Sequence, residues 1–168
     1  LNRFNSNGDI LINNNTFRGG GVELAEYNAG GGMVTVDNNA FDSEFAIGYT
    51  NRLRLKNNQQ DKVTLISNNT FNNHSWGISL ENYSDVTVDN NTFTPVDIAE
   101  YRHITVNTKL NNSKSNTIVQ DEINGTFINN FFNPAATAGG GLAMAFYYHD
   151  SNDASIGTFV VGTDGNEN

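Results

Sequence analysis

The sequence predicts an all-β fold of stacked, repeated coils, and three observations support this prediction. The phrase that runs from Val63 to Asp85 starts again immediately afterwards. Its first half, an apolar run that leads into Asn-Asn-Thr-Phe, recurs with small changes from Ile10, Val34 and Gly125. Each copy holds short alternating runs rich in Val, Ile, Thr and Phe, which are typical of strands and too short for helices. Because neither run can bury its apolar face alone, the copies must stack on one another.

The spacing of the copies predicts one domain with loops of variable length. The copies start at residues 10, 34, 63, 86 and 125, which are 24, 29, 23 and 39 residues apart. Leucine-rich repeats need a denser leucine pattern than this chain has. We expect a single domain over residues 1–161 of about five to six coils, about 25 to 30 Å tall at the usual strand spacing. Residues 162–168 form an acidic tail, and the first residues read as the end of a preceding coil, so we expect further coils of the same parent chain.

The repeated phrase resembles that of right-handed parallel β-helices of the pectate-lyase-like type. The resemblance covers nearly the whole chain and implies a right-handed parallel β-helix, a solenoid with Asn and Phe ladders. Asn tolerates the left-handed backbone that a bend between strands needs, and stacked amides can hydrogen-bond along the axis. The predicted Asn ladder is Asn15, Asn39, Asn69, Asn91 and Asn130, and the predicted Phe ladder is Phe17, Phe41, Phe71, Phe93 and Phe132.

Charge and composition exclude several classes of partner. The net charge is −9 and the isoelectric point is near 4.5, which argues against nucleic acid and anionic membranes. The chain has no cysteine, so disulfides and thiolate metal sites are excluded. No apolar run is long enough to predict membrane insertion.

The second half of the repeat predicts a column of tyrosines. The sequences VELAEY, ISLENY, VDIAEY and LAMAFY align as second strands, with Tyr27, Tyr83, Tyr101 and Tyr147 in one column. A row of tyrosines is a platform on which sugar rings can stack. The alternative is an aromatic stack that only stiffens a corner.

Two insertions carry most of the positive charge. They span Asn51–Lys62 and Arg102–Asn124, and the second contains a run, HITV, that we expect as an extra strand. Because the insertions lie two coils apart, about 10 Å, they can meet on one side and hold the carboxylates of an anionic polysaccharide. The alternative is two solvated loops. Seven of the nine basic residues fall here: Arg52, Arg54, Lys56, Lys62, Arg102, Lys109 and Lys114.

Residues suited to proton transfer gather near the carboxyl end of the chain. Tyr147, His149 and Asp150 are candidate catalytic residues, with His74 and His103 elsewhere. Tyr, His and Asp are the residue types needed to abstract a proton from a uronate.

The tail GTDGNEN resembles the opening of the calcium-binding repeats of secreted bacterial RTX proteins. That resemblance implies calcium as a cofactor and Asp164 as a ligand, because carboxylates and turn carbonyls suit a hard cation. A β-helix followed by such repeats resembles the architecture of mannuronan C5-epimerases. The chain lacks their Asp-Pro-His signature and the motifs of lyases and polygalacturonases, so no catalytic residue is carried over.

Three functions remain open. The first is a β-helix segment of a secreted or cell-surface bacterial protein that binds polysaccharide. The second is part of a polysaccharide lyase or uronate C5-epimerase. The third is a structural spacer of an adhesin or fibre. The fold alone does not choose among them.

Overall fold

The computed structural model describes residues 9–27, 33–42, 53–57, 63–81, 85–96, 101–107, 123–134, 141–147 and 156–162. Within these ranges the regular secondary structure is β-strand, which confirms the predicted all-β class. The part of the chain that is described contains no helix long and apolar enough to cross a membrane.

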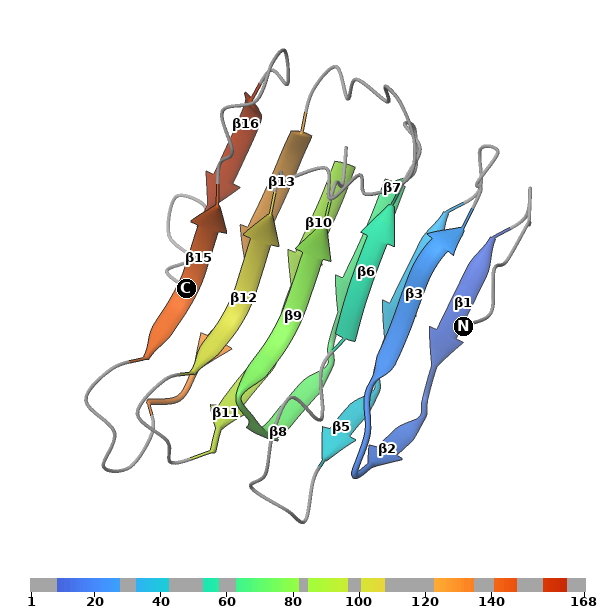
Figure 1. Ribbon diagram of the computed structural model, residues 1–168, viewed down its shortest axis with the longest axis vertical. Helices are drawn as coiled ribbons and strands as arrows, with labels where there is room; N and C mark the ends of the chain where they lie inside the picture. The colour runs from blue at the N-terminus through green and yellow to red at the C-terminus, as the bar shows by residue number, and fades with distance from the viewer. Residues whose placement is uncertain are drawn as a thin grey trace.

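The strands form three parallel sheets, and every third strand joins the same sheet (Figure 1). We call each run of three successive strands a coil. Sheet A contains β1 (Ile10–Asn13), β4 (Val34–Asp37), β7 (Val63–Ser67), β10 (Asp85–Asp89), β13 (Ile123–Ile128) and β16 (Ile156–Val161). Sheet B contains β2 (Thr16–Arg18), β5 (Ala40–Asp42), β8 (Thr70–His74), β11 (Thr92–Pro95) and β14 (Phe131–Phe132). Sheet C contains β3 (Val22–Tyr27), β6 (Leu53–Asn57), β9 (Trp76–Glu81), β12 (Arg102–Asn107) and β15 (Leu142–Tyr147). This succession of parallel strands is compatible with a parallel β-helix.

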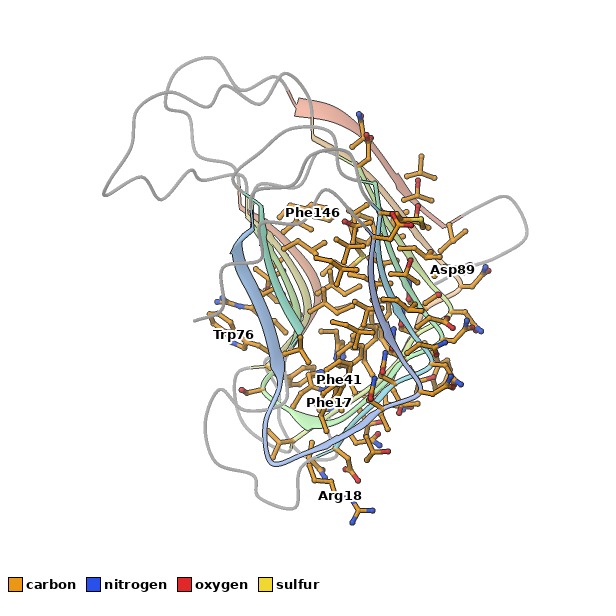
Figure 2. The ribbon with its side chains drawn as sticks, turned by 90° about the vertical axis from the view of Figure 1, so that its right-hand side faces the viewer. Phe17, Arg18, Phe41, Trp76, Asp89 and Phe146 are labelled. Carbon is orange, nitrogen blue, oxygen red and sulfur yellow. The ribbon has the colours of Figure 1, made fainter. Side chains whose placement is uncertain are left out.

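The core lies between the sheets, and the predicted Phe ladder is confirmed. On β4, β5 and β10 buried residues alternate with partly exposed ones, and Figure 2 shows Phe17 and Phe41 in the interior. Neighbouring rings stack with centroids 4.9, 4.7, 4.9 and 5.3 Å apart in the order Phe17, Phe41, Phe71, Phe93 and Phe132. Offset-stacked rings add to the apolar burial of each side chain.

The predicted Asn ladder is also confirmed, and it runs along the corner between sheets A and B. Asn39 donates its main-chain N–H and its side-chain amide to Oδ1 of Asn69, at 2.9 and 3.0 Å. Asn69 donates in the same way to Asn91, and Asn91 to Asn130. These side chains are buried, so the row satisfies polar groups that water cannot reach.

The prediction that the ladder residues themselves adopt the left-handed backbone is wrong. This conformation belongs to the residue before each of them, where φ lies between 53° and 59°. The ladder residue must turn its amide inward and keep its main chain in the parallel pairing, so the bend falls on its exposed neighbour. The residues with this conformation are Asn14, Asn38, Asn68, Asn90 and Asn129.

Each coil has three strands rather than the two that the repeat predicted. In coil two the third strand is β6, which we had assigned to an insertion. In coil four it is β12, which contains the HITV run; the VDIAEY segment does not form it. The register explains both corrections, because Leu53 and Leu55 pair with Ile78 and Leu80, and β12 continues the same apolar columns.

A break in the Asn ladder should be costly. Replacing Asn69 with Ala removes the acceptor for two Asn39 donors and the donor for the Val36 carbonyl. We expect Asn69→Ala to lower the free energy of unfolding by about 3 to 5 kcal/mol, because buried groups lose their partners. Urea denaturation followed by circular dichroism measures this. Asn15→Ala, at an exposed position of the ladder, is the control and should cost about 1 kcal/mol; equal losses would contradict the ladder's role.

One core hydroxyl should be removable with a gain in stability. Thr64 is buried between Val34 and Val86 of sheet A, and its Oγ1 has no hydrogen-bond partner. We expect Thr64→Val to raise the free energy of unfolding by about 1 kcal/mol, because an unsatisfied polar group becomes apolar. Thr87→Val, in the same sheet but on its outer face, should change it by less than about 0.5 kcal/mol. A loss of stability in Thr64→Val, measured by urea denaturation, would contradict this account.

Candidate functional site

Sheet C brings together three of the predicted basic residues. Arg54 pairs with Ser79, and Lys56 pairs with Glu81 of β9. Arg102 pairs with Trp76 on the other side of the same strand. β6 and β12 are two strands apart, about 10 Å, but Arg102 is level with Trp76, which precedes Ser79 and Glu81 by three and five residues, about 10 and 17 Å along the strand. Part of each predicted basic insertion is thus a strand of sheet C rather than a loop; Arg52, Lys62, Lys109 and Lys114 lie outside the described residues, and the meeting of the two insertions stays a prediction.

The clearest side-chain arrangement on this sheet is a stacked pair of Trp76 and Arg102. The guanidinium carbon of Arg102 lies 5.2 Å from the centre of the Trp76 ring, within the range of a cation–π contact. Figure 2 shows Trp76 on the outer side of sheet C, away from the core. Leu142, the register partner of Arg102 on β15, is 47 % exposed. We call Trp76 and Arg102 the Trp–Arg pair.

The Trp–Arg pair suits a ligand that combines an apolar ring face with an anionic group. An indole ring offers a flat surface for stacking, and a guanidinium offers a planar fork for a carboxylate. Arg102 was among the residues predicted to bind substrate, whereas Trp76 was missed. The sequence did contain a signal for Trp76, because it is the only tryptophan of the chain and begins a run with alternating apolar residues.

The predicted tyrosine column is wrong for Tyr101. Tyr101 precedes β12, whereas Tyr27 and Tyr147 end β3 and β15 and pair with Asn57 and Asn107. Tyr101 therefore lies at the opposite end of the strands. It is only 8 % exposed and faces the interior, so it cannot serve as an outer platform. Its ring also fills the space next to Gly141, where a Cβ atom would come within 1.8 Å of it.

Several other predicted site residues cannot be placed. For Tyr27, Arg54, Lys56 and Tyr147 the backbone is described and the side chain is not. Among the described residues, no group of three or more His, Asp or Glu side chains is close enough together to hold a metal ion. The remaining candidates lie outside the described residues: Arg52, Tyr83, His149, Asp150 and Asp164.

Directly inside the Trp–Arg pair, two buried histidines form a hydrogen-bonded pair, which we call the histidine pair. Nε2 of His74 lies 2.9 Å from Nδ1 of His103, and Nδ1 of His74 lies 3.0 Å from the carbonyl oxygen of Phe71. The two side chains are 0 % and 2 % exposed, so neither can meet a substrate as acid or base. Burial and then repulsion from His103 lower the pKa of His74 to about 3, against hydrogen bonds to the backbone of Phe71 and Thr94. Burial also lowers the pKa of His103 to about 4.

The backbone around the histidine pair is unusual. Asn73 has φ of 55°, the one described non-glycine residue with positive φ outside the corner between sheets A and B. The register between β8 and β11 shifts at this point, between Thr94 and Pro95. Gly77 lies so close to β12 that a Cβ atom would come within 2.6 Å of the His103 carbonyl oxygen and 3.0 Å of the Phe93 ring. These features turn His74 inward and bring coils three and four into close contact.

Comparison with known proteins identifies no relative of this chain. No protein-family model, curated protein or solved structure matches it. The structure therefore establishes an all-β chain with parallel sheets, and its function has to be inferred from the geometry of sheet C.

The close contact at Gly77 predicts a strongly destabilising substitution. We expect Gly77→Ala to lower the free energy of unfolding by about 3 kcal/mol, because the new methyl group meets backbone and an aromatic ring that have no room to move. Chemical denaturation measures this value. Gly20→Ala is the matched control, since a Cβ atom there meets nothing within 4 Å. Equal stability of the two variants would contradict the contact.

Proposed function

We propose that this chain is a segment of a parallel β-helix, outside the cell or on its surface, that binds an anionic polysaccharide along sheet C. The observation that carries the proposal is the Trp–Arg pair on the outer face of the sheet. The resemblance of the repeat and of the tail to secreted bacterial proteins supports the location. The alternatives, catalysis and a spacer role, have no comparable arrangement among the described side chains.

The indole of Trp76 supplies the contact with the sugar ring. Carbohydrate rings have apolar C–H faces, and an aromatic side chain buries them while the hydroxyls stay in water. The ring is held in place from one side by Arg102, so less side-chain freedom is lost when a sugar stacks on it. A rigid aromatic on an exposed face is thus a suitable anchor for a weakly apolar ligand.

The guanidinium of Arg102 supplies selectivity for acidic sugars. Arginine can bind both oxygens of a carboxylate, and it does so in a fixed plane. The register places Arg54 and Lys56 on the strand at the other side of β9. The protein is acidic overall, but charge interactions at exposed sites are screened beyond about 8 Å at physiological ionic strength. Arg54 and Lys56 pair with Glu23 and Glu81, well within that distance, whereas Arg102 pairs with Trp76 and Leu142, so we expect the carboxylate to bind at Arg102.

Sheet geometry favours a long ligand over a single sugar. Successive strands of sheet C lie about 4.8 Å apart, so a polymer that runs along the stack meets the outer residues of one strand after another. Repeated weak contacts of this kind reinforce one another through effective concentration. We therefore expect measurable retention on a polymer and weak binding of the monosaccharide.

The test is retention on affinity gels that contain polygalacturonate or alginate. We expect Trp76→Ala and Arg102→Ala each to weaken binding about 10-fold or more, since each removes one of the two anchors. Arg102→Lys keeps the charge and loses the planar fork, so it should also bind more weakly. Binding by the unchanged protein should fall as salt is raised.

The matched control is Phe131→Ala. Phe131 is 62 % exposed and lies on sheet B rather than sheet C, so the variant loses an exposed aromatic side chain that is not part of the Trp–Arg pair. It should bind like the unchanged protein, and none of the variants should lose more than a few degrees of melting temperature. Unchanged retention of Trp76→Ala would remove the proposal. Ultraviolet absorbance of the eluate, which detects unsaturated sugars, keeps cleavage of the polymer from being mistaken for weak retention.

A further inference from the structure

We propose that the histidine pair makes the Trp–Arg pair sensitive to acid: on acidification the two buried rings separate, the corner between β8 and β9 opens, and the bound polymer is released. The release step rests on the proposed function, whereas the opening of the corner does not. Three observations support the proposal. They are the positions of the four side chains, the number of protons that the histidine pair can hold, and the tight packing of the backbone around the histidine pair.

The two pairs join the same two coils from opposite sides. His74 ends β8, and Trp76 begins β9 two residues later. Arg102 and His103 are consecutive residues of β12. On the inner side His74 contacts His103, and on the outer side Trp76 contacts Arg102. A change in the distance between the histidine rings must therefore act on the backbone that carries the Trp–Arg pair.

Hydrogen-bond roles fix the protons of the histidine pair at neutral pH. A carbonyl oxygen only accepts, so Nδ1 of His74 carries a hydrogen for Phe71. The neutral ring then has a lone pair on Nε2, which accepts the N–H of His103 Nδ1 at 2.9 Å. Both protons of the neutral pair are thereby used in hydrogen bonds.

Acid disrupts this arrangement in two steps. A first added proton has to reside on the second nitrogen of His103 and makes the buried pair a cation. A second proton places hydrogens on both His74 Nε2 and His103 Nδ1, which face each other at hydrogen-bond distance. Two donors cannot share one hydrogen bond, so the rings must move apart.

The surroundings offer little to stabilise the cation. The rings in contact with the histidine pair come from Phe71, Phe93, Tyr101 and Phe132. On the described strands packed against the pair, the charged residues are Arg102, which stacks on Trp76, and Glu81, at the far end of β9. Two phenols are also near: Tyr101 contacts the His103 ring, and Tyr147 ends β15, the neighbour of β12. Backbone hydrogen bonds at Phe71, Thr94 and Asn133 oppose the effect of burial without cancelling it.

The direction of the pH effect follows from the lowered pKa values. The pKa of histidine in an unfolded chain is about 6.5, above the values of about 3 and about 4 for His74 and His103. The open or unfolded chain thus binds more protons than the folded one between these limits. The contribution of the pair to stability is complete above about pH 6.5 and is lost as the pH falls through the folded pKa values.

The backbone around the histidine pair is packed too tightly to adjust when the two rings move apart. Gly77 already touches the His103 carbonyl and the Phe93 ring so closely that a methyl group does not fit. Asn73 holds a left-handed conformation next to His74. Strained, tightly packed segments respond to a local change by switching arrangement rather than by bending gradually.

The first test uses the single tryptophan as a reporter, without any polymer. Fluorescence of Trp76 is followed from pH 8 to pH 3 in the unchanged protein, in the double variant H74N/H103N, and in H149N as the control for the third histidine. We expect a transition between about pH 5 and pH 3 that H149N keeps and that the double variant loses or shifts down by about one pH unit. Identical transitions in all three proteins would overturn the proposal.

Two further measurements keep the outcomes distinct. If the double variant does not fold, proton NMR of the three histidines in the unchanged protein decides: two should titrate below pH 5, and normal midpoints for all three would overturn the proposal.

Retention on polygalacturonate is then compared at pH 7 and pH 4 for the unchanged protein and the double variant. Protonation of the polymer itself affects both proteins equally, so a difference between them comes from the histidines. Loss of retention at pH 4 in the unchanged protein alone supports release. No retention at pH 7, with a histidine-dependent fluorescence transition, removes the proposed function and leaves the switch.

Discussion

The structure depends on the hydrogen bonds of one side-chain amide in each coil, which is buried in coils two to five. Where sheet A turns into sheet B, the main chain leaves its regular pairing and exposes polar groups to the interior. The ladder of Asn side chains supplies partners for these groups, as when Asn69 binds the carbonyl of Val36 and the amide of Asn91. The Phe ladder can pack directly behind this corner only when the polar groups there are hydrogen-bonded. Without partners, the buried polar groups would cost more free energy than the packing of the Phe rings contributes.

The features that follow from a short local phrase could be predicted from the sequence. Asn-Asn-Thr-Phe specifies the bend, the amide ladder and the inward Phe within four residues, so both ladders were found. The strands of sheet C could not be found in this way. Their residues vary from coil to coil. VDIAEY resembles VELAEY in sequence, but the strand of coil four that pairs in sheet C, β12, starts later, at Arg102. That error also misplaced Tyr101, which lies in the interior beside His103.

The Trp–Arg pair and the histidine pair depend on contacts between coils, which no single stretch of sequence displays. Trp76 and Arg102 meet only because β9 and β12 pair in one particular register. Likewise, the two histidines point inward because Asn73 turns the backbone and Gly77 leaves room for the next coil. The corner between β8 and β9 thus places the buried histidine pair directly behind the Trp–Arg pair on the outer face.

The Asn ladder has a further consequence, because it has a direction. Each of four side-chain amides donates to the amide oxygen of the next coil, in the order Asn15, Asn39, Asn69 and Asn91, and Asn130 accepts the last of these bonds. The amide dipoles are therefore aligned head to tail along the stack, and each bond polarises its neighbours, as peptide dipoles do within a helix. The stack carries an electrical polarity along the direction in which the coils repeat, and the strands add little to it because their peptide dipoles alternate.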